Sequence, residues 1–490
     1  ALHEWAVDLC SQIRFPIDAG DFGDASHPES RHHDRLFQEV AHNEAVILQQ
    51  LDRLLARADD YGSDRLPADL RDAICLIGAA LMRLWSVTWS YERIADYGSR
   101  LIAPAVQPAQ DPRGNEAGLS VLALCVTLFG LLSHMPMQVR SLLPASFDGE
   151  GPFSRVRRFL RASDAQWPEL IDDADPWVAW AATRCLAAQQ EDDGDPQASL
   201  RTIEALLGRL HGNDLAGIHL LELHLHRLQV LMSLGRYSQV IDACSRAQVL
   251  LERVLPSWGE FFHTTLHMEG AYCAVYLDPR PETADRLLES LEPVDLPGTM
   301  RFIARSVLGE LELTRGNART AALIQRVSLR YAGNWRSILG SGSQWELYIL
   351  SMCLVTDVEL SPDDAVELDA RAVRARATSL LREILSDPAP RQRDIPTLMA
   401  FAAAVGLSAV AAEDVGSDRR AVGGELVATA LAVGTNQTCR LLSHDYLRSR
   451  TERLDARALA QAEERIRSLD RGGLVAHAAD LAGRLAGEVG

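Results

Sequence analysis

The sequence predicts an all-α protein, a solenoid of helical hairpins, on three observations. The hydrophobic content of 47% is rich in Ala and Leu, which are strong helix formers. Apolar residues recur three and four positions apart, the period of one helix face. Turn residues interrupt these stretches about every 40 positions. At 490 residues the chain also exceeds the usual single core, so an elongated repeat array or several domains are expected.

The N-terminal part begins with a short helical pattern over residues 2–13 and a loop to about residue 33. One long amphipathic helix is predicted over residues 36–58. Residues 74–101 then form a predicted hairpin. Its first helix carries Ile74, Ile77, Leu81 and Trp85, and its second begins at Tyr91.

Residues 104–114 are a predicted loop, and residues 119–133 a predicted buried helix. Three prolines and two glycines interrupt residues 134–153, which makes this stretch the best candidate for a boundary or hinge. We therefore predict an N-terminal helical subdomain over residues 1–150, which opens the solenoid, and helical repeats over residues 151–490.

The clearest repeat is LMSLGRYSQVIDACSRA at residues 231–247. One helix ends at Leu234, Gly235 closes the turn, and Tyr237 begins the partner helix. Glycine suits the left-handed residue just past a helix end. Similar turns occur at residues 193–196, 278–281 and 315–317, with less regular breaks near residue 361 and at 414–418. Two helices in each period of about 40 residues are typical of a helical solenoid.

Composition excludes several functions. The net charge is −18, so we expect no direct binding of nucleic acid by this region. The chain has no lysine, so a GxxxxGK[ST] phosphate loop is impossible.

The eight cysteines include no CxxC pair, which favours reduced structural thiols and a cytoplasmic location. The apolar runs at 119–132 and 395–412 are interpreted as buried helices, because the first is too short to span a bilayer and the second is rich in small residues.

Two ordered motifs resemble a known family. The segment FQEVAHNEAVIL at residues 37–48 is similar to the "AEHDNLRAAL" segment of large bacterial STAND-type transcriptional regulators, although Glu44 stands where that family prefers Leu. IGAALMRLW at residues 77–85 is similar to their "LAAALWRFW" helix, and Trp85 matches the final Trp. The Gly-Arg-Tyr turn at residues 235–237 resembles the tetratricopeptide repeat (TPR) pattern, whose strict period is 34 residues.

The resemblance implies the C-terminal TPR-like sensor region of a SARP-type (AfsR-like) activator of antibiotic biosynthesis. Such a region receives an effector, a small molecule or a peptide, and controls the ATPase and DNA-binding modules upstream in the same protein and their oligomerisation. A homo-oligomer is kept as an open alternative. The chain starts at Ala1 without an initiator Met, so we expect an excised fragment.

Two alternatives stay open: a stand-alone TPR-like scaffold or peptide receptor, and an unrecognised helical enzyme. No Ser/His/Asp order, nucleophile elbow or pair of catalytic carboxylates stands out. We therefore expect neither an enzyme nor a cofactor.

Three groups of residues are candidates for binding. His219, Glu222 and His226 share one helix face at i, i+3 and i+7, which suits a cation or an anionic ligand. The alternative is a polar stripe facing the solenoid groove, and we expect no metal. The pair in HTTLH at residues 263–267 lacks the Glu that would make it a zinc motif.

The second group is the basic cluster Arg155, Arg157 and Arg158, which suits phosphate or carboxylate partners such as an upstream domain or its nucleotide. A salt-bridged solvent face is the alternative. The third group is aromatic: Trp85 and Trp89 line a ligand pocket or fill the core, and the same two interpretations apply to residues 177 and 180.

Overall fold

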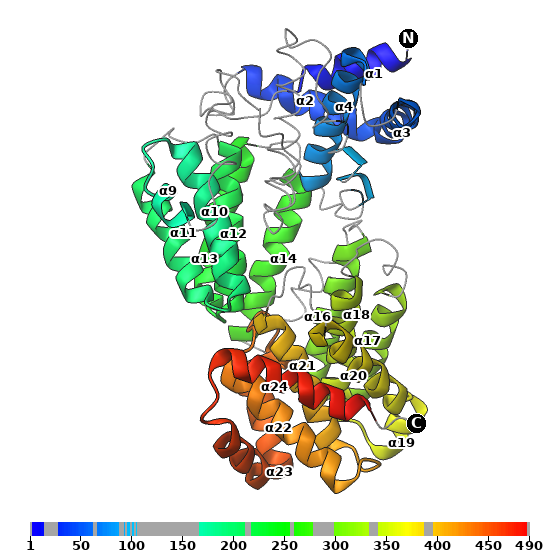
Figure 1. Cartoon of the computed structure of the whole chain (residues 1–490), viewed down its shortest axis with the longest axis vertical. Coiled ribbons are helices and arrows are strands. Elements are labelled where there is room, and N and C mark those ends of the chain that lie inside the picture. Colours follow the sequence, from blue (N-terminus) through cyan, green and yellow to red (C-terminus); the bar gives the residue numbers. More distant parts are fainter. Residues whose placement is uncertain are drawn as a thin grey trace. The chain divides into compact units, whose positions relative to one another are not determined.

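A computed structural model describes residues 2–13, 28–61, 66–87, 93, 96–98, 100–101, 104, 166–210, 217–254, 259–277, 298–332, 342–386 and 395–487. Within these ranges every regular element is a helix and no strand occurs, which confirms the all-α prediction (Figure 1). The helices of this part of the chain are too short or too polar to cross a membrane.

The chain divides into two compact units. Unit 1 comprises residues 1–190, 198–227 and 245–266, and unit 2 comprises residues 191–197, 228–244 and 267–490. This division was not predicted. The predicted boundary at residues 134–153 and the predicted helix at 119–133 lie outside the described residues.

Unit 1 begins with four helices, of which α4 contacts the other three: α1 (Leu2–Ser11), α2 (Pro28–His42), α3 (Glu44–Asp60) and α4 (Ala68–Val87). Their core includes Ile47, Leu51, Ile74 and Leu81, all buried. The rest of the unit includes α9 (Trp167–Leu170) and most of α10 (Pro176–Asp192) and α11 (Pro196–Arg209). Three further helices contribute to both units: α12 (Gly217–Ser233), α13 (Tyr237–Val254) and α14 (Gly259–Leu277).

The single long helix predicted over residues 36–58 is wrong, because α2 and α3 are separated at Asn43. The backbone of Asn43 leaves the helical region, with φ −105° and ψ 13°. Its side-chain amide donates to the Glu39 carbonyl at 2.8 Å. Asparagine side chains compete in this way with the helical backbone, and a periodicity count does not register the effect.

Unit 2 contains the remaining helices: α16 (Gly298–Thr314), α17 (Ala318–Ala332), α18 (Gly342–Asp357), α19 (Pro362–Glu367), α20 (Ala370–Ser386), α21 (Ile395–Ala411), α22 (Ser417–Val433), α23 (His444–Ile466) and α24 (Arg471–Ala486). A 3₁₀ turn, η5 (Arg440–Leu442), precedes α23. Helix α22 contacts α21, α23 and α24, while α18 contacts α17, α20 and α21 (Figure 1). The helix predicted from the apolar run at 395–412 is thereby confirmed as the buried α21.

Three of the predicted hairpin turns are confirmed. Gly194, Gly235 and Gly316 each follow a helix with a positive φ, of 76°, 67° and 85°. A Cβ atom is strained in this conformation, so glycine ends the helix and lets the next one start within a few residues. The predicted turn at residues 278–281 lies outside the described residues.

The cysteines agree with the prediction of structural thiols. Seven of them lie in the described ranges, and each is free and buried. Cys125 falls outside those ranges.

Candidate functional site

The structure describes four of the eight predicted site residues. Trp89, Arg155, Arg157 and Arg158 lie outside the described residues. The other four fall in two places in unit 1: Trp85 on α4, and His219, Glu222 and His226 on α12.

Trp85 packs as a core residue. Its side chain is fully buried, and its Nε1–H donates to Glu44 Oε1 at 2.7 Å. Its ring lies 5.4 Å from that of Tyr97, between centroids. Glu44 stands where the similar STAND-type segment has Leu, and in this chain it accepts the hydrogen bond of the buried indole. Trp85 therefore ties α4 to the start of α3, and this contact supports the core alternative over a ligand pocket.

The polar face of α12 is directed inward. His219 and His226 are both buried, and His219 Nδ1 lies 3.5 Å from Glu222 Oε2. Glu222 Oε1 also accepts a hydrogen bond from Arg83 of α4 at 3.0 Å. The ring of Trp180 lies 4.2 Å from that of His219. The predicted face thus contributes to an ion-paired network between α4, α10 and α12.

Glu222 is ionised in this network. Burial alone would raise its pKa, but the Arg83 charge and the hydrogen bond with His219 lower the pKa to about 2. The side chains of Arg83 and Glu222 are only 12% and 20% exposed. Among the described residues no group of three or more His, Cys, Asp or Glu side chains is arranged to hold a metal ion.

Glu222→Gln is expected to lower the free energy of unfolding by roughly 2 kcal/mol at pH 7, because it leaves the Arg83 charge partly buried without its partner. Because the folded-state pKa is depressed, this contribution is present above pH 4.5 and is lost as the pH falls toward 2. Urea denaturation at pH 7 and pH 3 measures both effects.

The control is Glu204→Gln, which removes an exposed partner of Arg227 on the neighbouring helix, 2.7 Å away. Exposed ion pairs contribute well under about 1 kcal/mol. Equal effects of the two variants at pH 7 would show that the Glu222 pair is merely a surface contact.

In unit 2, the connection between α22 and α23, which includes η5, is bound by several helices that are distant in the sequence. We name residues 434–443 the strap. The Gln437 N–H donates to the Ser233 carbonyl at the end of α12 (2.9 Å). The Gln437 carbonyl accepts from the Tyr237 hydroxyl at the start of α13 (2.7 Å). The α12–α13 turn thus binds both main-chain groups of one strap residue.

The first part of the strap is also bound to α21. The Asn436 N–H donates to the Pro396 carbonyl at 3.0 Å, and its side-chain amide donates to Thr397 Oγ1 at 2.9 Å. An added Cβ at Gly235 would lie 3.3 Å from Gln437 Cβ, so the absence of a side chain at Gly235 lets the strap pack close to the turn. Main-chain groups of the strap take part in three of these four hydrogen bonds.

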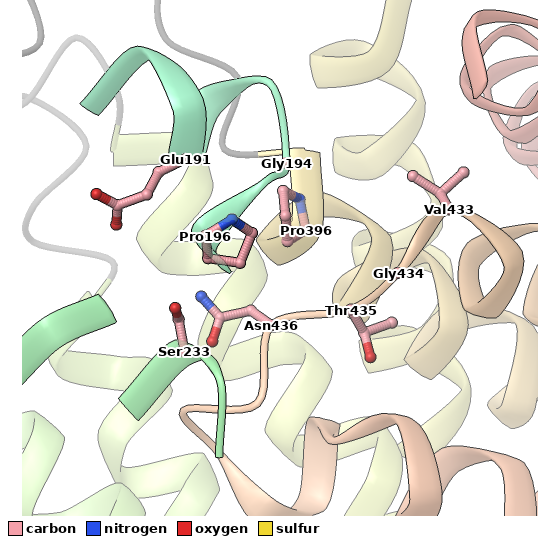
Figure 2. Close-up of a pocket in the computed structure, with 9 residues that line it drawn as sticks. All are labelled: Glu191, Gly194, Pro196, Ser233, Pro396, Val433, Gly434, Thr435 and Asn436. Carbon is pink, nitrogen blue, oxygen red and sulfur yellow. The ribbon is translucent and has the colours of Figure 1, made fainter. Parts of the chain in front are cut away.

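A small pocket of about 110 Å³ lies beside the strap. It is lined by the turn after α10, the last residue of α12, the start of α21 and the first residues of the strap (Figure 2). Pro196 and Pro396 provide apolar rings, while the carboxylate of Glu191 points away from them (Figure 2). Small-molecule sites usually measure roughly 300 Å³ or more, so this pocket has room for one amino-acid side chain.

The second part of the strap meets a buried polar cluster around Glu310 of α16. Glu310 is 2% exposed and accepts hydrogen bonds from Tyr272 (2.9 Å) and Tyr276 (2.5 Å) of α14. The Cys439 thiol of the strap donates to Glu310 Oε1 at 2.8 Å. The Tyr276 hydroxyl in turn accepts from the Arg440 N–H at 2.9 Å.

Burial dominates the electrostatics of this cluster. It raises the pKa of Glu310, although the donors from Cys439, Tyr276, Tyr272 and the Leu441 main chain oppose the shift. Burial and the nearby Glu310 carboxyl likewise raise the pKa of the Tyr272 and Tyr276 hydroxyls and of the Cys439 thiol. Among the described residues the donors to this buried acid are all neutral, which is an unusual arrangement, and the strap supplies two of them.

The sequence does not predict the strap. Residues 435–438 (TNQT) are polar and aperiodic, a pattern typical of an exposed loop. The available signal is a glycine and four polar residues directly after an apolar helix, followed by Cys439, Arg440 and two leucines. Its partners come from α12, α13, α14, α16, α18 and α21, which no local pattern brings together.

Comparison with family models, with curated proteins and with solved structures finds no match for this chain.

Proposed function

We propose that this chain is a binding domain of helical hairpins that recognises an extended polypeptide segment along its turns. The observation that carries the proposal is the strap. The α12–α13 turn and the start of α21 already hold residues 436 and 437 of this chain, largely through main-chain groups. Main-chain recognition tolerates many sequences, so the same turns suit a segment of another polypeptide.

The adjoining pocket favours a peptide over a small molecule as the effector. Its volume of about 110 Å³ fits one side chain, and the rings of Pro196 and Pro396 offer an apolar surface for it. The amide of Asn436 is already bonded to Thr397, and the Ser233 carbonyl is already bonded to the strap.

We further propose a TPR-like solenoid with a period of about 40 residues. The positive-φ glycines 194, 235 and 316 support it, since they are 41 and then 81 positions apart, or one and two periods. Each of the three follows one helix and precedes another by at most two residues.

The regulatory setting rests on the motifs at residues 37–48 and 77–85. We propose that the domain senses its partner within a SARP-type member of the STAND transcriptional activators. Binding of the partner then controls the ATPase and DNA-binding modules upstream in the same protein. The coding sequence upstream of residue 1 tests this directly. A P-loop and a DNA-binding domain in the same reading frame support it, whereas a start codon at this point favours the stand-alone scaffold.

Peptide binding is expected to increase at least tenfold in the full chain carrying Gln437→Pro, because proline removes the N–H that donates to Ser233 and weakens the strap. The probe is a fluorescent synthetic peptide with the sequence of residues 434–443, followed by anisotropy. A scrambled peptide is the specificity control, and Gln437→Ala, which keeps the N–H, is the matched variant. Equal binding of both peptides, or binding of neither, would contradict the proposal.

A further inference from the structure

The strap is held at two places that differ in chemistry. Residues 436 and 437 are bonded to main-chain carbonyls and side-chain hydroxyls of the turns. Residues 439–441 are bonded to the Glu310 carboxyl and to Tyr276, which itself donates to that carboxyl. The Leu441 N–H also donates to Glu310. Three successive strap residues therefore depend, directly or through one hydroxyl, on a single acid.

Every described group that is hydrogen-bonded to that acid is neutral. The titratable groups facing Glu310 come from each element packed around it, and those in hydrogen-bond contact are the hydroxyls of Tyr272 and Tyr276 and the thiol of Cys439. Other groups that feel its charge are Tyr237 of α13, Tyr348 of α18 and Tyr446 of α23. No Arg or His is bonded to Glu310 in the described ranges, so an ionised carboxylate there has no counter-charge in contact.

We propose that Glu310 and the strap form a proton-controlled latch: the strap stays closed over protonated Glu310 and opens when the buried carboxyl loses its proton. The inference rests on the proposed function in one respect, that the closed strap occupies the peptide-binding turns. Opening uncovers them, so the latch regulates access to that site.

The direction follows from linkage. Burial raises the pKa of Glu310 in the closed state, whereas a hydrated carboxyl in the open state has its ordinary pKa. The closed state therefore binds the proton more tightly. Raising the pH from about 4.5 through the raised pKa favours the open state by up to tenfold per pH unit. When Glu310 is protonated, its O–H can donate to a tyrosine hydroxyl, because hydroxyls accept as well as donate.

The test is peptide-resolved hydrogen exchange on the full chain between pH 4.5 and pH 8, expressed as protection factors corrected for intrinsic exchange. In the wild-type chain, protection of residues 434–443 is expected to fall at least tenfold across this range and to stay below that of α21 at every pH, because the strap exchanges by local opening. In Glu310→Gln, strap protection is expected to be independent of pH. The control Glu312→Gln, on the same helix but paired with Arg315, is expected to behave as the wild type.

Tyr272→Phe keeps the test decisive if Glu310→Gln does not fold. It removes one donor to the carboxylate, so the loss of strap protection is expected to be deeper and to extend to higher pH. A pH-independent strap in the wild-type chain overturns the latch. Protection of the strap equal to that of α21 at every pH also overturns it, because both segments would then exchange only through global unfolding.

The two proposals fail separately. If the strap peptide binds the Gln437→Pro chain but strap protection ignores pH, the latch is wrong and the binding function stands. If protection follows pH but no peptide binds, the latch stands and the binding function is wrong.

Discussion

Gly406→Ala is expected to lower the free energy of unfolding of unit 2 by about 3 kcal/mol, the upper part of the range for overpacked cores. A Cβ atom on Gly406 of α21 would lie 2.5 Å from the carbonyl oxygen of Gly423 on α22. It would also lie 2.9 Å from Val427 Cγ2 and 3.1 Å from the Val427 main-chain nitrogen. Backbone atoms form most of this contact, so the two helices must move apart to admit the methyl group.

Urea denaturation followed by circular dichroism measures this loss, and pulse proteolysis assigns it to unit 2. Gly483→Ala is the matched control, since its Cβ would meet nothing within 4 Å on α24. That variant is expected to stabilise the chain by up to about 1 kcal/mol, because alanine is the better helix former. If Gly406→Ala behaves like this control, α21 and α22 do not pack in backbone contact in solution.

The small residues around Gly406 show what a sequence predicts well. The run at 395–412 is rich in Ala, Gly and Ser, which predicts a buried helix in close contact with another helix, and α21 is such a helix. The role of Gly235 is equally predictable from the sequence, because a lone glycine between two periodic stretches ends one helix and precedes the next. Both predictions depend on backbone sterics, which act locally.

Asn43 and Glu222 show where local rules fail. The apolar period continues across Asn43, yet its side chain bonds to the backbone and divides the helix. The spacing of residues 219, 222 and 226 correctly predicts a shared face. It does not predict whether that face meets solvent or a buried arginine, because Arg83 lies 139 positions earlier in the chain.

The strap is the clearest case of information that resides only in the fold. Gln437 is bonded to Ser233 and Tyr237, about 200 positions away, and Cys439 to Glu310. A polar segment acquires structure when distant helices satisfy its main-chain groups, and no local pattern records that.

Glu269→Gln is expected to raise the free energy of unfolding by about 3 kcal/mol at pH 9 and to change it little at pH 4.5. Glu269 lies on α14. The residue as a whole is half-buried, and its carboxyl group is surrounded by protein. Burial raises its pKa from 4.5 to about 7. Glu269 in turn contributes to the raised pKa of the buried thiols of Cys244 and Cys273.

The sign follows from proton binding. Between pH 4.5 and pH 7 the folded chain holds a proton on Glu269 that the unfolded chain has released, so stability falls as the pH rises through this window. Above it, the wild-type fold carries a buried negative charge, whereas glutamine is neutral at every pH. Below it, the protonated acid and the amide are nearly equivalent in size and polarity.

Urea denaturation at half-unit steps from pH 4.5 to pH 9 measures the difference, and the exposed Glu383→Gln on α20 is the control. Glu269→Gln is expected to change the global unfolding curve and to keep the pH dependence of strap protection, whereas Glu310→Gln is expected to remove that pH dependence, so the two acids are separable in one set of variants. A flat difference between wild type and Glu269→Gln across this range would mean that the carboxyl stays hydrated in solution.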